Sequence, residues 1–236
     1  MKTKLFFLSS LFCLIAVETG SVRSMHGFPG SRLGDVEENS SMILDDWTLQ
    51  MARKDVQVCT RWIISPRKIE VRQVKGTIRI NVKREQVARS ITEVELARKW
   101  MDFMDELNYY KNPESPGEWF AYGRINVMGK LACFDVVTRN RVLSDPMNNK
   151  TLISMNDTIG YLPDKPGVYR IHGVLSFWNL ITIGPDETVI ELILCSDMDP
   201  VIPTWMTDPV VYRLMVSTLN HLKERLQEKT RLPQIN

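Results

Sequence analysis

Near its C-terminus the chain reads DMDPVIPTWMTDPVVYRLMVSTLNHLKERL over residues 197–226. Between residues 209 and 228 apolar side chains recur three and four residues apart, which places them on one face of an α-helix. Pro209 suits the first helical position, where its missing N–H needs no partner. The pattern predicts a long final helix with one apolar face. That face carries Val211, Leu214, Met215, Thr218, Leu219, Leu222 and Leu226, and the other face carries Tyr212, Arg213, Asn220, Lys223, Glu224 and Arg225.

Upstream of this helix, apolar and polar residues alternate over many short runs, the pattern of half-buried strands. The spacing of apolar residues predicts a helix over residues 43–54 and two short helices over 84–92 and 93–104. A break at residues 74–76 predicts a β-bulge. The predicted strands cover residues 56–63, 69–82, 119–127, 131–143, 150–156, 168–183 and 189–196, with turns at 113–117 and 184–187.

This order of elements predicts an α+β fold in one domain over residues 42–232. A curved antiparallel sheet with one apolar face needs a cover, and the final helix has the apolar stripe to provide it. A sheet that wraps around one long helix leaves space between the two layers, where an apolar ligand can bind.

The N-terminus has the pattern of a signal peptide over residues 1–20. Lys2 and Lys4 precede an uncharged apolar run over residues 5–17, which is too short for an ordinary membrane span. Residues 21–41 are rich in Ser, Gly and Glu and are expected to form a flexible leader. We therefore expect an exported protein, periplasmic in a bacterium and secreted in a eukaryote.

The composition excludes several classes of protein. Hydrophobic residues make up 44% and charged residues 25% of the 236 residues, as in an ordinary globular chain. The net charge is only +2, without the basic excess expected of a nucleic-acid binder. No second apolar run reaches 18 residues, so we expect a soluble mature protein, and we expect a monomer.

Three segments of the chain resemble one known family. They are WTLQMARKDVQVCTRWI over residues 47–63, ARKWMDFMDELNYYK over residues 97–111, and the Asp199, Pro200, Pro203 and Trp205 motif before the final helix. The chain resembles a START domain, the steroidogenic-acute-regulatory-related lipid transfer family, in a short exported form.

The resemblance implies a helix-grip fold with an interior apolar cavity. It also implies reversible binding of a lipid or sterol-like molecule, no cofactor, and transient contact with membranes. Two departures weaken the transfer of ligand identity. Residues 128–142 keep only Asp135 and the apolar pair after it, and Val201 and Ile202 replace the family's usual glycines.

Alternation along the last strand turns Ile190, Leu192 and Leu194 inward and Glu191 toward water. Together with four residues of the final helix, Val211, Met215, Thr218 and Leu222, they are the predicted cavity wall. The alternative interpretation is that all of these residues are ordinary core.

Arginines inside the predicted strands are the candidates for holding a polar head group. Arg124 lies among Tyr122, Ile125 and Val127 and is a candidate cavity residue. Arg139 and Arg141 share one face of their strand, which we expect to be the solvated side of the sheet.

Two other functions stay open. An enzyme on the same fold, similar to aromatase/cyclases, needs acid/base groups in the cavity, and His172, Arg124 and Asp135 are the candidates. A protein that has lost its pocket and acts through interactions is the other alternative. No nucleophile elbow or zinc-binding motif is present in the sequence.

The cysteines and the Asn-x-Ser/Thr triplets leave further questions open. Cys59, Cys133 and Cys195 fit no metal or redox spacing, and either free thiols or one disulfide are compatible with the sequence. The triplets at Asn39, Asn149 and Asn156 matter only in a host that glycosylates exported proteins.

Overall fold

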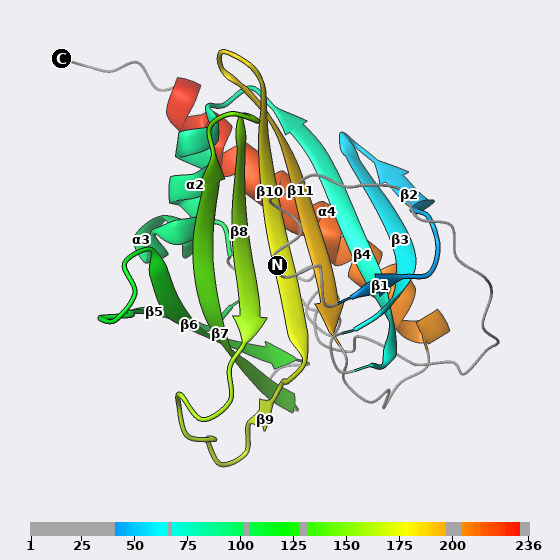
Figure 1. Cartoon of the computed structure of the whole chain (residues 1–236), viewed down its shortest axis with the longest axis vertical. Helices are drawn as coiled ribbons and strands as arrows, with labels where there is room; N and C mark the ends of the chain where they lie inside the picture. The colour runs from blue at the N-terminus through cyan, green and yellow to red at the C-terminus, as the bar shows by residue number, and fades with distance from the viewer. Residues whose placement is uncertain (1–40, 66–67, 102–103, 128–131, 197–203, 232–236) are drawn as a thin grey trace, which may run out of the picture.

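The computed structural model of the chain describes residues 41–65, 68–101, 104–127, 132–196 and 204–231 (Figure 1). The predicted signal peptide, the predicted leader up to residue 40, Asn39 and residues 197–203 lie outside these ranges. In chain order the elements are β1 (Met42–Ile43), β2 (Thr48–Arg53), β3 (Val56–Ile64), β4 (Glu70–Ile80), α2 (Arg84–Thr92), α3 (Val94–Ala97), β5 (Glu106–Lys111), β6 (Glu118–Val127), β7 (Ala132–Asp145), β8 (Lys150–Asp157), β9 (Tyr169–Arg170), β10 (Val174–Gly184), β11 (Glu187–Ser196) and α4 (Thr204–Arg231).

One sheet contains all the strands of the described residues. Its order is β1-β3-β4-β11-β10-β8-β7-β6-β5, with β2 paired to β3 and β9 paired to β7. Every pairing is antiparallel except the short one between β7 and β9. The early strand β4 lies beside the last strand β11, so the two ends of the domain meet within the sheet. Figure 1 shows α4 running across one face of this sheet.

The core lies between α4 and that inner face. Met215, Leu219 and Leu222 of α4 are at most 1% exposed and belong to the same apolar cluster as the inner residues of the central strands. Strand alternation supplies those inner residues, such as Val58 and Ile190. The predicted helix-grip α+β fold is therefore confirmed.

Gly76 of β4 sets how closely the helix approaches the sheet. A Cβ at this position would lie 2.6 Å from the Sδ atom of Met215 and 2.8 Å from Cδ1 of Leu219. The absence of a side chain lets α4 pack directly on the backbone of β4. The bulge predicted at residues 74–76 is wrong, because Gly76 pairs in regular register with Val58 and Leu192.

The predicted helix over residues 43–54 is also wrong. Residues 48–53 form β2, which pairs with β3 through a tight hairpin that closes at Lys54. Lys54 has a φ of 54°, the left-handed conformation that such a turn requires. The short apolar repeat in this segment is compatible with either a helix or a strand, and its pairing with β3 stabilises the strand.

The final helix is longer than predicted. It begins at Thr204, so Pro209 lies inside the helix, where it removes one backbone hydrogen bond near the N-terminal end. Tyr212 and Asn220 were expected on the exposed face, but each is only 8% exposed. The Nδ2 atom of Asn220 donates to the carbonyl of Val216 at 2.7 Å, which satisfies its amide within the helix.

Two other predicted elements are shorter in the structure. The second short helix ends at Ala97, and the strand predicted over residues 168–183 is divided into β9 and β10. Gly173, with a φ of 70°, lies between these two strands, where the chain changes direction.

We expect Gly76→Ala to lower the free energy of unfolding by about 1–3 kcal/mol, the usual range for an overpacked core. The added methyl group forces Met215 and Leu219 away from the sheet. Urea denaturation of the wild type and the variant measures the difference.

Gly184→Ala is the matched control, because a Cβ there would meet only Glu187, at 3.4 Å from its Cβ. Equal loss of stability in both variants would contradict a specific contact between Gly76 and α4.

Candidate functional site

The predicted cavity wall lies on two surfaces that face each other. Ile190 and Leu192 of β11 are 0% and 4% exposed, and Leu194 packs against the same cluster. On α4, Thr218 is 7% exposed, and the other predicted residues, Val211, Met215 and Leu222, are at most 1% exposed. The structure brings these seven residues to one interior, and their contact with a ligand stays a prediction.

Polar groups interrupt this apolar interior on β6, β7 and β10. Asn140 of β7 is fully buried, and its amide is satisfied by the carbonyls of Trp119 and Thr138 and by the Thr138 hydroxyl. The indole nitrogens of Trp119 and Trp178 are buried without a hydrogen-bond partner. Both tryptophans pack in or against the core cluster that contains α4. An indole N–H is a donor only, so the interior holds two unused donors.

An ion pair fastens the beginning of α4 to the sheet. Arg72 of β4 pairs with Asp208 of α4, and the two side chains are 14% and 19% exposed. The hydroxyl of Tyr212 lies 3.3 Å from Oδ2 of Asp208 and donates to it. Burial lowers the pKa of Arg72 and raises the pKa of Tyr212. Sequence periodicity does not predict this contact, because it joins residues 136 positions apart.

Arg124 does not belong to this interior. Its neighbour Gly123 faces Met104 of the core, so alternation turns Arg124 to the outer face of the sheet. There Arg124 pairs with Glu106 of β5, with 3.3 Å between Nη1 and Oε2. We therefore remove Arg124 from the candidate cavity residues.

The other two candidates for catalysis also lie away from the interior. Asp135 is on the outer face of β7, where Nε of Arg170 donates to its Oδ1 at 2.6 Å. The side chain of His172 is 46% exposed, and its Nδ1 lies 3.6 Å from Asp157. The structure thus brings none of the three together as acid/base groups in a cavity.

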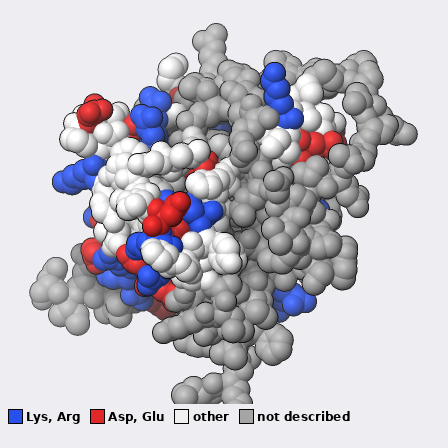
Figure 2. Space-filling view, turned by 90° about the horizontal axis from the view of Figure 1, so that it is seen from below, with Lys and Arg blue, Asp and Glu red and all other residues white. Residues whose placement is uncertain are grey.

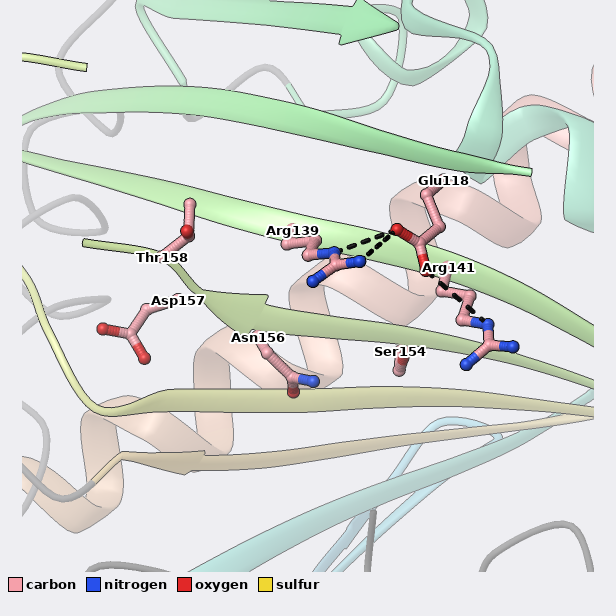
Figure 3. Close-up of a pocket in the computed structure, with 7 residues that line it drawn as sticks. All are labelled: Glu118, Arg139, Arg141, Ser154, Asn156, Asp157 and Thr158. Atoms are coloured by element: carbon pink, nitrogen blue, oxygen red, sulfur yellow. Dashed lines mark hydrogen bonds and ion pairs between the residues drawn. The ribbon is translucent and has the colours of Figure 1, made fainter. Parts of the chain in front are cut away.

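A pocket of about 340 Å³ lies on the outer face, where β6, β7 and β8 run side by side (Figure 3). Arg139 and Arg141 were expected on the solvated side of the sheet, and the structure places them here. Their partner Glu118 was not predicted, because the pairing of Glu118 with Arg141 depends on the register between β6 and β7, which the local sequence does not reveal. The pocket is lined by Glu118, Arg139, Arg141, Ser154, Asn156, Asp157 and Thr158, which we call the outer groove.

Charged patches, metal-ligand clusters and membrane-spanning helices would mark other kinds of site. On the described part of the face that it presents, Figure 2 shows basic and acidic side chains interspersed. In the described ranges, no group of three or more His, Cys, Asp or Glu side chains is arranged to hold a metal ion. Among the described residues, Cys59, Cys133 and Cys195 form no disulfide. No helix among the described residues is long and apolar enough to cross a membrane.

Comparison with solved structures assigns the fold to a class. The chain has a START-like fold, the architecture of the STAR-related lipid transfer domains. A STAR-related lipid transfer protein from Xanthomonas axonopodis matches with a TM-score of 0.66 and 19% identity, over 78% of this chain and 99% of that one. Human StAR-related lipid transfer protein 5 matches with a TM-score of 0.66 and 16% identity, over 78% and 88% of the two chains.

An enzyme also shares the architecture. The Zhui aromatase/cyclase from Streptomyces sp. R1128 matches with a TM-score of 0.50 and 14% identity, over 70% of this chain and 98% of that one. No family model and no curated protein matches the sequence. At these identities the comparisons show the fold alone.

Asp135→Asn should lower the free energy of unfolding by about 3 kcal/mol, because it leaves a buried guanidinium without its carboxylate. Asp135 and Arg170 are 1% and 7% exposed. Thermal and urea denaturation measure the loss.

The control is Asp164→Asn, which removes a second carboxylate near Arg170 that is 77% exposed. An exposed pair contributes at most about 1 kcal/mol. If the two variants lose the same stability, the buried pair does not fasten β9 to β7.

Proposed function

We propose that the protein binds a hydrophobic ligand, such as a lipid or sterol, between α4 and the inner face of the sheet. The observation that carries this proposal is the pair of unused indole donors of Trp119 and Trp178 in a largely apolar interior. A buried donor without a partner is costly, and a ligand oxygen would satisfy it. The START-like fold of proteins that are named for lipid transfer supports the same function.

The mechanism that we propose is physical. A movement of α4 or of a neighbouring loop admits the ligand, and each Å² of apolar surface that leaves water contributes about 25 cal/mol. The rate of that movement then sets the rate of exchange. We extend this proposal to transfer of the ligand between membranes, because transfer requires reversible binding.

Export belongs to the same proposal. Its support is the basic start and the short apolar run of residues 1–20, which lie outside the described part of the chain. The enzymatic alternative has less support, because Arg124, Asp135 and His172 lie on the outer side of the sheet or beside it.

Native mass spectrometry of the protein purified from its own host, followed by organic extraction, tests the proposal. We expect a discrete added mass that extracts as a lipid. We also expect a protein mass that is lower than that of the full sequence by the mass of the predicted signal peptide. A ligand-free mass that sterols, fatty acids and phospholipids leave unchanged would overturn ligand binding and favour the interaction protein.

We expect Trp178→Phe to weaken the binding of cholesterol or oleic acid about three- to ten-fold, the effect of one lost hydrogen bond. The substitution removes the N–H and keeps an aromatic ring against Trp100, whose ring centre is 5.8 Å away. Titration followed by native mass spectrometry measures the affinity.

Trp47→Phe is the control, because Trp47 packs on the outer cluster formed by Leu152, Phe177 and Ile193. If Trp178→Phe binds both lipids as tightly as the control does, the Trp178 donor has no role in binding.

Asp208→Asn should make ligand exchange several-fold faster, because it weakens the ion pair between the start of α4 and Arg72. Stopped-flow transfer of a fluorescent sterol from the protein to vesicles measures the rate.

Asp55→Asn is the matched control, since Asp55 pairs with Lys223 near the other end of the helix, where the carboxylate is 65% exposed. Faster exchange in both variants alike would mean that the opening is not at the beginning of α4.

A further inference from the structure

The outer groove lies on the face of the sheet opposite α4. Asn140 and Val142 of β7 point into the interior, so the alternating residues Arg139 and Arg141 point outward. In register, Arg141 lies between Glu118 of β6 and Ser154 of β8, and Arg139 lies beside Asn156. The lining is therefore polar on every side (Figure 3).

A buried carboxylate organises the basic end of the groove. Oε2 of Glu118 accepts hydrogen bonds from Nε and Nη2 of Arg139, at 2.9 and 2.6 Å, and Oε1 lies 3.8 Å from Nε of Arg141. The Glu118 side chain is 9% exposed, whereas the two arginines are 56% and 49% exposed. The hydrogen bonds from Arg139 lower the pKa of Glu118, so its carboxylate is charged at neutral pH.

These three side chains carry one net positive charge and unused donors. A guanidinium has five N–H groups. Arg139 donates two of these N–H groups to Glu118. The polar contact of Arg141 within the described part of the chain is the 3.8 Å ion pair with Glu118, so most of its N–H groups are available to a ligand. Each guanidinium has a planar fork of N–H donors that matches the geometry of a carboxylate or a phosphate. Figure 3 shows Arg139 and Arg141 on either side of Glu118, both lining the outer groove.

The other end of the groove has the opposite character. Asp157 is the last residue of β8 and Thr158 follows it. Asp157 lies 3.6 Å from Nδ1 of His172. A carboxylate at this end repels a second anionic group on the ligand but accepts hydrogen bonds from hydroxyl groups. Ser154, which is 2% exposed, adds a hydroxyl to the floor between the two ends.

We propose that the outer groove binds a small hydroxylated molecule with one carboxylate or phosphate, such as a sugar acid or a sugar phosphate. The oxyanion lies on Arg139 and Arg141, and the hydroxyl groups lie toward Ser154 and Asp157. The volume of about 340 Å³ accommodates a molecule of this size. A phosphate of an anionic lipid headgroup has the same chemistry and is the other source of such a ligand.

Isothermal titration calorimetry of the full mature chain with gluconate and with glucose 6-phosphate tests this site. We expect saturable binding that weakens with added salt. Arg141→Gln and Arg139→Gln should each weaken it about ten-fold or more, the effect of losing a charged hydrogen bond. Sedimentation with phosphatidylglycerol vesicles tests whether the ligand is a lipid headgroup. If the protein binds vesicles but neither soluble probe, and Arg141→Gln abolishes that binding, the ligand of the outer groove is a lipid headgroup.

Arg79→Gln is the matched control. Arg79 is 65% exposed and paired with Glu187, like Arg139 with Glu118, but it lies on β4 outside the groove. Absence of binding to both soluble probes and to vesicles would overturn the proposal, as would equal losses in Arg79→Gln and Arg141→Gln. Because lipid loading of the interior is measured separately by native mass spectrometry, failure of this site leaves the proposed function intact, and the reverse also holds.

Discussion

The apolar face of α4 has to be kept from water, and most of the fold follows from the way the sheet covers it. Met215, Leu219 and Leu222 lie on the inner residues of the central strands, and Gly76 lets the helix touch the backbone of β4. The sheet reaches around the helix because β4 pairs with the last strand, β11. Burial of one helix face thus joins the beginning and the end of the domain into one structure.

A single layer of strands gives the domain two chemically different faces. Alternation sends Asn140 and Val142 to the interior and Arg139 and Arg141 to the outside of the same strand, β7. The inner face is mostly apolar, with the satisfied amide of Asn140 and the unpartnered indole N–H groups of Trp119 and Trp178, whereas the outer face carries ion pairs such as Arg139 with Glu118. The two ligands that we propose, one apolar and one polar, would therefore bind on opposite faces of one sheet without competing.

Period-two alternation correctly placed Ile190, Leu192 and Leu194 inward, because in a strand whose apolar residues alternate with polar ones the apolar side is the one that is buried. Alternation alone does not place Arg124. Alternation groups Arg124 with Tyr122 on one face, but only the register with Glu106 and Asp135 shows that this face lies outside. Residues 43–54 were misassigned for a similar reason, since the hairpin with β3 outweighs the helical spacing of a short segment.

The contacts of α4 are unevenly distributed along its length. From Met215 to Leu226 apolar side chains lie against the sheet, whereas near its beginning the helix is also held by the polar contacts of Asp208 with Arg72 and Tyr212. Separating an apolar contact exposes surface to water over its whole area, but an ion pair that opens toward solvent regains hydration for both charges. If α4 moves to admit a ligand, we therefore expect the smallest free-energy barrier at its N-terminal end, with the contact between Met215 and Gly76 of β4 as the fixed point.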